Sequence, residues 1–500
     1  MIQSSCVGAL DQGTTGTRFI VFDSSGRRIS SAYREHDGIY PQPGWVEHDP
    51  GEIWENVKKV VRQGLEDGGL TGEDLIGIGV TNQRETVLAW DEEGRPLANA
   101  IVWQDRRTSR RCEELRCSGK AQLIKDKTGL KLDPYFSGTK LEWLMGNVPG
   151  LEEKARRGEA LFGTMESFLI WKMTGGKHLT DFSNASRTLL FDIENLQWDE
   201  ELLDIFDVPR RALPEPVENV GAFGEIETIE ELQGVPIGAA FGDQQAALFG
   251  QGCLRPGEAK NTYGTGSFLL LNVGETPVFS EDLLTTVAFS LNGEVKYALE
   301  GSIYSTGATV QWLRDELGLL EDASQSEELA IQAEDNGGVY LVPAFTGLGA
   351  PHWDSQARGL IIGLTRGSGR KQLVRAGLES IAYQVEEVLR SMKDQSPIEL
   401  EELRVDGGAS ENSFLCQFQS DISSMPVVNM EMKEATALGA AYGAGLELGL
   451  WQDVEDIERV AGERKGETFL PRMKARRRKE LFSEWERAVK RAKGWARDED

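Results

Sequence analysis

Two glycine- and threonine-rich segments, about half a chain apart, constrain the fold most strongly. The first, DQGTTGTR at residues 11–18, lies between apolar runs at 7–10 and 19–22. The second lies within residues 261–272, NTYGTGSFLLLN, and also leads into an apolar run. Each pattern predicts a strand, a tight turn and a second strand. Because the unit occurs twice, we expect two halves that each open on a hairpin.

Helical and strand patterns alternate through the rest of the chain. Asp49 followed by Pro50 is typical of a helix start, and apolar residues continue at helical spacing from there. Residues 75–80 and 86–90 are predicted strands, and residues 373–392 a long helix. Alternation over 500 residues predicts an α/β fold. We expect two domains, residues 1–252 and 253–500.

Acidic residues outnumber basic ones by 81 to 54, which gives a net charge of −27. Nucleic-acid binding depends largely on Lys and Arg that neutralise phosphates, so no nucleic-acid partner is expected. No apolar run approaches the roughly 20 residues of a membrane-spanning helix, so no integral membrane contact is expected. The N-terminal sequence has no export-signal pattern, and the five cysteines have no regular spacing. We therefore expect a cytoplasmic protein.

The C-terminal residues 471–493 carry ten Lys and Arg against three Glu. Leu481, Phe482, Trp485 and Val489 recur there at helical spacing. This pattern predicts an amphipathic helix with a solvated basic face rather than a nucleic-acid site.

The first glycine-rich segment has the chemistry of a phosphate site. Its glycines allow close backbone approach, and successive N–H groups in such a turn can bind an anion. Thr14, Thr15 and Thr17 add hydroxyl donors, Arg18 adds a positive charge, and Asp11 could hold a cation. The segment suits a nucleotide phosphate with Mg²⁺, although a β-hairpin with threonine turn residues has the same pattern.

Two polar clusters follow predicted strands. In TNQRET, residues 81–86, Arg84 can donate and Glu85 can accept hydrogen bonds, which suits a small polyhydroxyl substrate; a solvated turn is the alternative. Asp243 beside Gln244 is an arrangement suited to a general base, and Asp243 could equally be the N-cap of a following helix. Trp103 could supply an apolar wall.

A further segment, residues 405–412 with the sequence VDGGASEN, predicts a strand, a Gly-Gly turn and a helix start. Two glycines let a flat ring approach the backbone, and Asn412 offers an amide. The segment fits an adenosine pocket or an ordinary strand–turn–helix unit.

Together these segments resemble the FGGY carbohydrate kinases. The matching stretches run from about residue 6 to 450 and include LDQGTTGTR, TNQRET, DPYFSGTK, GDQQAALFGQ, NTYGTGSF, LRVDGGAS and ALGAAYGAG. The resemblance implies two actin-like, ribonuclease-H-like ATPase domains with substrate and nucleotide in a central cleft. TNQRET and DPYFSGTK are typical of the members that phosphorylate glycerol, so the resemblance implies Mg²⁺-dependent transfer from ATP to give sn-glycerol 3-phosphate.

The resemblance also assigns roles to residues of matching motifs. Asp243 would be the general base, and Asp11 and Asp243 would lie near Mg²⁺. The glycerol pocket would comprise Arg84, Glu85, Trp103, Tyr135, Asp243, Gln244 and Phe268. The nucleotide would contact Thr14, Thr15, Gly16, Arg18, Thr265, Gly307, Gln311, Gly408 and Asn412. Gly16 departs from the family pattern, in which Ser is common at this position.

Two other functions fit parts of the pattern. A related kinase could act on another small polyol or ketose, such as dihydroxyacetone, erythritol or xylulose. An actin-like or chaperone-like ATP switch would use the hairpins alone, but it would need no polar clusters of the TNQRET and GDQQ kind. We expect glycerol and ATP as the ligands and a homodimer or homotetramer as the assembly.

Overall fold

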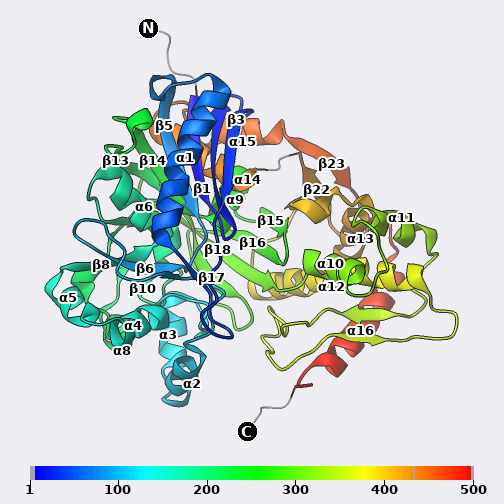
Figure 1. The fold of residues 1–500 in the computed structure, drawn as a ribbon. Coiled ribbons are helices and arrows are strands. Elements are labelled where there is room, and N and C mark those ends of the chain that lie inside the picture. Colours follow the sequence, from blue (N-terminus) through cyan, green and yellow to red (C-terminus); the bar gives the residue numbers. More distant parts are fainter. Residues whose placement is uncertain (1–5, 432–433, 497–500) are drawn as a thin grey trace.

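The computed structural model describes residues 6–431 and 434–496. The chain forms two lobes, each built on a mixed β-sheet covered by helices (Figure 1). The prediction that the N-terminal sequence has no export signal concerns residues 1–5 among others, and these lie outside the described residues.

The first lobe is built on a six-stranded sheet. Strand β1 pairs antiparallel with β2 and parallel with β5, and helix α1 (Pro50–Gly68) packs on β2 and β3. Asp49 caps α1 by accepting a hydrogen bond from Gly51 N at 2.8 Å, as the sequence predicted. In spatial order the strands are β13 (Val220–Glu225), β14 (Pro236–Gly242), β5 (Leu75–Asn82), β1 (Cys6–Gln12), β2 (Gly16–Asp23) and β3 (Arg28–Glu35).

The second lobe is built on a seven-stranded sheet that repeats this arrangement. Strand β15 pairs antiparallel with β16 and parallel with β21, so the predicted duplication of a hairpin unit is confirmed. The long helix predicted near residues 373–392 is α12 (Arg370–Gln395). In spatial order the strands are β17 (Leu284–Leu291), β18 (Glu294–Ile303), β16 (Ser267–Gly274), β15 (Ala259–Tyr263), β21 (Leu403–Asp406), β22 (Val427–Met430) and β23 (Lys465–Phe469).

Two helices rich in small residues connect the lobes. Helix α14 (Ala435–Glu447), which contains ALGAAYGAG, packs against α9 (Asp243–Gly250) and against strands β1, β5 and β14 of the first sheet. A Cβ atom at Gly439 would lie 1.8 Å from the carbonyl oxygen of Ala246, so only glycine permits this backbone contact. A segment from late in the chain thus supports the first sheet, and the boundary at residues 252 and 253 stays a prediction.

A smaller four-stranded sheet and several helices extend the first lobe. This sheet has the order β4 (Glu47–His48), β7 (Ala100–Ile101), β6 (Val87–Asp91) and β8 (Ala160–Thr164). The helices around it include α2 (Ser109–Cys117), α3 (Ala121–Thr128), α4 (Gly138–Asn147), α5 (Leu151–Arg157), α6 (Met165–Thr174) and α8 (Glu200–Phe206). The second lobe adds α10 (Gly307–Asp315), α11 (Gln325–Gln332), α13 (Ser413–Ser423), α15 (Val454–Gly462) and α16 (Ala475–Ala492).

The predicted C-terminal amphipathic helix is confirmed as α16. Its apolar residues Leu481, Phe482, Trp485 and Val489 are buried, whereas most of its Lys and Arg side chains are exposed. Among the described residues, no helix is long and apolar enough to cross a membrane.

A buried histidine of the first lobe leads to a pH-dependent prediction. The His178 ring lies edge-on to Trp90 and Trp171, and its Nε2–H donates to the Phe162 carbonyl oxygen at 2.8 Å. Burial lowers the pKa of His178 from 6.5 to about 4. The folded protein therefore holds a neutral ring that the unfolded chain protonates below pH 6.5, so stability falls as pH falls from 6.5 towards 4.

We expect His178→Phe to remove this contribution. Between pH 7 and pH 4.5, the free energy of unfolding should fall by roughly 2–3 kcal/mol less in the variant than in the wild type. Urea unfolding at the two pH values measures the difference. An identical pH dependence for both proteins would contradict the assignment.

Candidate active site

Three strand ends of the first sheet meet at the site. In the register of the sheet, Gln12 at the end of β1 lies opposite Asn82 of β5, and Asn82 lies opposite Gly242 of β14. Gln83 N donates to the Gln12 carbonyl oxygen at 2.7 Å. The first glycine-rich segment, TNQRET and Asp243 lie at these strand ends, so the sheet brings together three motifs that are far apart in sequence.

Arg84 is the centre of the polar cluster. Its side chain is buried, and Nη1 and Nη2 donate to Glu300 of β18 at 2.5 and 3.0 Å. Its Nε lies 3.2 Å from Asp243 Oδ1. The Arg84 guanidinium therefore contacts both Glu300 of the second lobe and Asp243, the expected base, of the first.

Glu85 has an uncommon backbone conformation, with a φ of 62° in the left-handed region. Such a conformation in a residue other than glycine costs free energy and persists only where the surroundings hold it. Arg187 Nε donates to Glu85 Oε1 at 2.6 Å, and Ser137 Oγ donates to the Glu85 carbonyl oxygen at 3.1 Å. Burial raises the pKa of Glu85, opposed by the charges of Arg187 and Arg84.

Aromatic rings surround this polar cluster. The Trp103 and Tyr135 rings meet edge to face at 5.6 Å, and the Arg84 guanidinium lies 6.0 Å from the Phe268 ring. Trp103 Nε1 donates to Thr14 Oγ1 at 2.9 Å, which joins the aromatic wall to the first hairpin. Apolar walls around a few fixed polar groups are typical of a small-molecule site.

Asp243 and Gln244 open helix α9. The helix begins at Asp243 itself and Gly242 is the N-cap, so the N-cap interpretation of Asp243 is wrong. The Asp243 side chain nevertheless accepts from Gln244 N at 2.7 Å in the first turn. The Asp243 side chain is 31% exposed and can contact a ligand. Gln244 Oε1 accepts a hydrogen bond from Lys260 Nζ at 2.6 Å, and burial lowers the pKa of Lys260 to about 8.

The first hairpin presents Thr14 and Thr15 at its turn. A Cβ atom at Gly16 would lie 2.5 Å from the Arg34 carbonyl oxygen on β3, so this close contact requires glycine. The Arg18 guanidinium is paired with Glu434 and lies 5.1 Å from the Tyr33 ring. Arg18 thus has a protein partner in addition to any phosphate it would contact.

The second hairpin is held by the start of α10. Thr306 N and Ala308 N both donate to the Thr265 carbonyl oxygen, at 2.9 and 3.1 Å. A Cβ atom at Gly307 would lie 2.7 Å from the Gly264 carbonyl oxygen, so the close contact requires glycine. Gln311 is exposed one turn further along α10.

The VDGGAS segment lies beside this hairpin. Asp406 of β21 is opposite Thr262 of β15, which places the Gly-Gly turn next to the hairpin's loop, and Gly408 is exposed. Asn412 is the N-cap of α13, and its Oδ1 accepts from Leu415 N at 3.0 Å. The ordinary strand–turn–helix interpretation therefore describes this segment, and its exposed glycine leaves the backbone open to a ligand.

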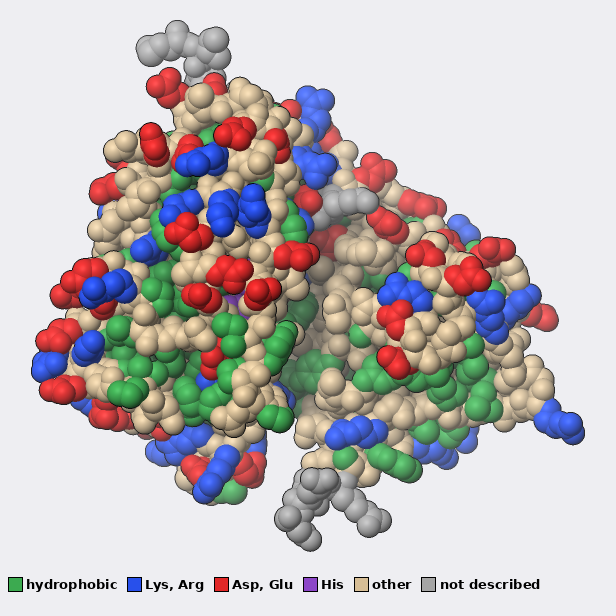
Figure 2. Space-filling model, viewed as in Figure 1, with side chains coloured by type: hydrophobic (Ala, Val, Ile, Leu, Met, Phe, Trp, Pro, Cys, Tyr) green, Lys and Arg blue, Asp and Glu red, His purple; other side chains and the backbone are tan. Residues whose placement is uncertain are grey.

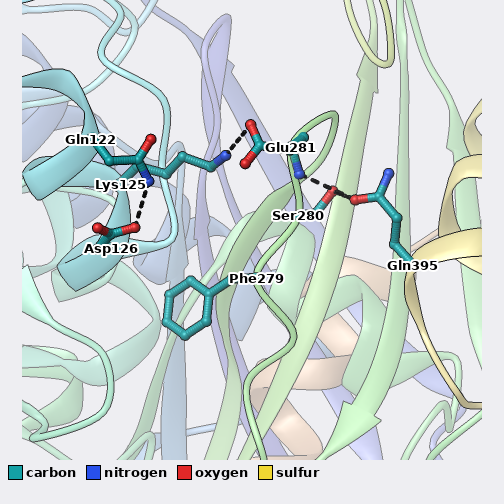
Figure 3. A pocket seen from close by; sticks show the side chains of 7 residues that line it. All are labelled: Gln122, Lys125, Asp126, Phe279, Ser280, Glu281 and Gln395. Carbon is teal, nitrogen blue, oxygen red and sulfur yellow. Dashed lines mark hydrogen bonds and ion pairs between the residues drawn. The ribbon is translucent and has the colours of Figure 1, made fainter.

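Figure 2 shows a deep hollow between the two lobes. A separate pocket of about 330 Å³ lies between α3 and the loop before β17 (Figure 3). It includes the ion pair of Lys125 with Glu281 at 2.6 Å, and no predicted site residue lines it.

Asp11 and Asp243 have the donor chemistry of a Mg²⁺ site. Burial raises the pKa of Asp11 to about 7; the charge of Arg18 opposes this shift, and the charges of Asp243 and Glu434 add to it. Mg²⁺ binds carboxylate oxygens and usually takes further ligands from substrate phosphates. Two neighbouring carboxylates beside a phosphate-type hairpin therefore fit the ion.

Comparison with known proteins decides the family. The model of the FGGY carbohydrate kinase N-terminal domain matches residues 6–250, and that of the C-terminal domain matches residues 259–448. The chain belongs to the FGGY family of carbohydrate kinases.

FGGY proteins similar to the chain cover nearly its full length. Glycerol kinase 2 of Thermotoga maritima is 53% identical over 97% of this chain and 98% of the relative. The crystal structure of Plasmodium falciparum glycerol kinase with ADP is 39% identical, with a TM-score of 0.93 over 97% of this chain and 98% of that one. Gluconate kinase from Lactobacillus acidophilus shares the fold, with a TM-score of 0.88 at 23% identity and coverage of 98% and 99%. The predicted two-domain α/β fold is confirmed.

Three residues of this FGGY site were missed by the sequence analysis: Arg187, Lys260 and Glu300. Glu300 carried a signal, because it is a charged residue inside the apolar run of β18, where an unpaired charge would be costly. Burial alone would raise the pKa of Glu300, but the charges of Arg187 and Arg84 outweigh burial and hold this pKa at about 2. Arg187 and Lys260 lie within the residues that the two family models match, but nothing local in the sequence indicated their partners.

Proposed function

We propose that this FGGY kinase transfers the γ-phosphoryl group of ATP to glycerol, giving sn-glycerol 3-phosphate and ADP. The observation that carries the proposal is that Arg84 Nε lies 4.0 Å from Glu85 Oε1 and 3.2 Å from Asp243 Oδ1. Trp103, which would line the same pocket, donates to Thr14 of the first hairpin. Glycerol kinases that match the chain over nearly its full length support the same choice of substrate.

Asp243 would act as the general base. Its carboxylate would take the proton of one terminal hydroxyl as that oxygen bonds to the γ-phosphorus and the bond from phosphorus to the β–γ bridging oxygen breaks. ADP leaves with the electron pair of that bond. Such transfer depends on positioning, charge neutralisation and a carboxylate placed to accept the hydroxyl proton.

The other hydroxyls would bind the polar cluster. Arg84 can donate to hydroxyl oxygens, and Glu85 can accept from a hydroxyl. The full proposed pocket is Arg84, Glu85, Trp103, Tyr135, Asp243, Gln244 and Phe268. A site built to hydrogen-bond hydroxyls rejects analogues that lack them by about 10⁴-fold or more.

The nucleotide would lie between the two hairpins. We propose that it contacts Thr14, Thr15, Gly16, Arg18, Thr265, Gly307, Gln311, Gly408 and Asn412. Asp11 and Asp243 would hold Mg²⁺, which neutralises phosphate charge when bound. We also propose domains at residues 1–252 and 253–500, a cytoplasmic location and a homodimer or homotetramer.

A panel of acceptors tests the choice of substrate. Steady-state ADP release should show the highest kcat/KM for glycerol among glycerol, dihydroxyacetone, erythritol and xylulose, measured with and without Mg²⁺. Glycerol presents three hydroxyls to the pocket, and a longer acceptor would have to displace the aromatic wall of Trp103 and Tyr135. A higher kcat/KM for xylulose or erythritol would contradict the proposal and favour a different polyol or ketose kinase.

A further inference from the structure

Lys260 is a buried lysine without a close counter-ion. It lies on β15 with no exposed surface, and among the described residues no carboxylate oxygen is within 4.0 Å of its ammonium. Instead, Nζ donates to Gln244 Oε1 at 2.6 Å and to Thr262 Oγ1 at 3.1 Å. Burying an ammonium group without a close ion pair costs free energy. Lys260 is therefore a candidate for a functional role in addition to packing.

The charges around Lys260 come from both lobes. Asp406 of β21 and Asp243 of α9 attract its charge, as does Glu300 of β18, whereas Arg84 repels it. Asp406 Oδ1 is buried and makes no hydrogen bond. The ammonium is thus stabilised by several carboxylates at a distance rather than by one ion pair, and its hydrogen bonds go to neutral partners.

That partner is the Gln244 amide. A lysine ammonium can only donate, so the oxygen of the amide must face Lys260 and the NH₂ group must face elsewhere. Among the described residues, Gln244 Nε2 makes no hydrogen bond. The contact therefore fixes which end of the amide is free, and the free end is a hydrogen-bond donor next to Asp243.

We propose that Lys260 is a positioning residue for substrate binding. By holding Gln244 Oε1, it presents Gln244 Nε2 as a donor to a hydroxyl oxygen of the acceptor, while Asp243 accepts a hydroxyl proton beside it. Lys260 belongs to the second lobe and Gln244 to the first. The hydrogen bond between them forms only when the two lobes are in contact, so acceptor binding through Gln244 also depends on that contact. This inference rests on the proposed function, because it takes glycerol as the acceptor.

Lys260→Met tests this role, because methionine retains most of the side-chain volume and removes the donors. We expect the KM for glycerol to rise by about 10- to 100-fold, the range for a lost hydrogen bond to a charged group. The KM for ATP should change less than about twofold, since the amide faces the acceptor. Lys296→Met is the matched control: this lysine lies on β18 and pairs with Glu275 and Glu294 at the surface, so both KM values should stay unchanged.

A double-mutant cycle separates positioning from general damage. If Lys260 acts through Gln244, adding Lys260→Met to Gln244→Ala should raise the glycerol KM by less than about twofold further. An equal rise in both backgrounds, or an equal rise in the KM for ATP and glycerol, would overturn the role.

If the Lys260→Met variant fails to fold, Gln244→Glu tests the same hydrogen-bonding role. It keeps an oxygen for Lys260 and replaces the free NH₂ donor with a charged carboxylate oxygen that cannot donate, so it should raise the glycerol KM by at least a similar factor. An unchanged KM in this variant would overturn the inference while leaving the proposed function intact. A wild-type enzyme that turns over ATP with another acceptor but not with glycerol would overturn both.

Discussion

Asp243→Asn is expected to abolish phosphoryl transfer while nucleotide binding persists. Asparagine keeps the size of the side chain and an oxygen that can face Arg84 Nε, but its amide cannot take a proton from the acceptor hydroxyl. Positioned general bases contribute about 10²- to 10⁴-fold. We therefore expect kcat to fall by about 10³-fold, with the dissociation constant of ATP changed by only a few fold, because the hairpins remain intact.

Single-turnover kinetics and calorimetric titration with ATP measure the two quantities separately. Asp453→Asn is a matched control, because Asp453 belongs to none of the site motifs, caps α15, and asparagine caps a helix equally well. If Asp243→Asn retained more than about a tenth of the wild-type kcat, a contribution below the lower end of the range for a base, Asp243 would lose that role.

Glu300→Ala is expected to destabilise the protein strongly. Glu300 accepts hydrogen bonds from Arg84 at 2.5 and 3.0 Å and from Arg187 at 3.0 Å, and all three side chains are buried. Removing the carboxylate leaves two guanidinium groups facing each other without that counter-charge. Breaking a buried ion pair in this way costs about 3–5 kcal/mol of unfolding free energy.

Chemical denaturation of the two proteins measures this loss. Glu294→Ala is the control, because Glu294 lies at the other end of the same strand and pairs with Lys296 at the surface; such pairs contribute at most about 1 kcal/mol. Equal destabilisation by the two substitutions would show that the Glu300 network is not a buried support of the site.

Local patterns in the sequence predicted much of the fold. The hairpins, the start of α1 at Pro50 and the long α12 depend on turn residues, a cap and apolar spacing, all of which act within a few residues. The predicted meeting of Arg84 with Asp243 came from the family resemblance, and its physical cause is that β5 and β14 are parallel neighbours in the sheet.

Long-range partners could not be predicted in the same way. Glu300 contacts arginines that lie 216 and 113 residues away in sequence, and nothing local encodes that distance. Nothing in the sequence of α14 indicated that the helix lies against the first sheet. The left-handed backbone conformation of Glu85 could not be predicted either, because contacts with Arg187 and Ser137 hold it and no glycine marks the position.

We propose that the polyol lies beside the Asp243 carboxylate and that the triphosphate lies between the two hairpins. The most direct measurement is the rate of ADP release from Mg–ATP with and without glycerol, together with identification of the phosphorylated product. We expect ADP release to depend on glycerol, to saturate with glycerol concentration and to equal the sn-glycerol 3-phosphate formed, mole for mole. ADP release at the same rate without glycerol, or without a phosphorylated acceptor, would contradict it.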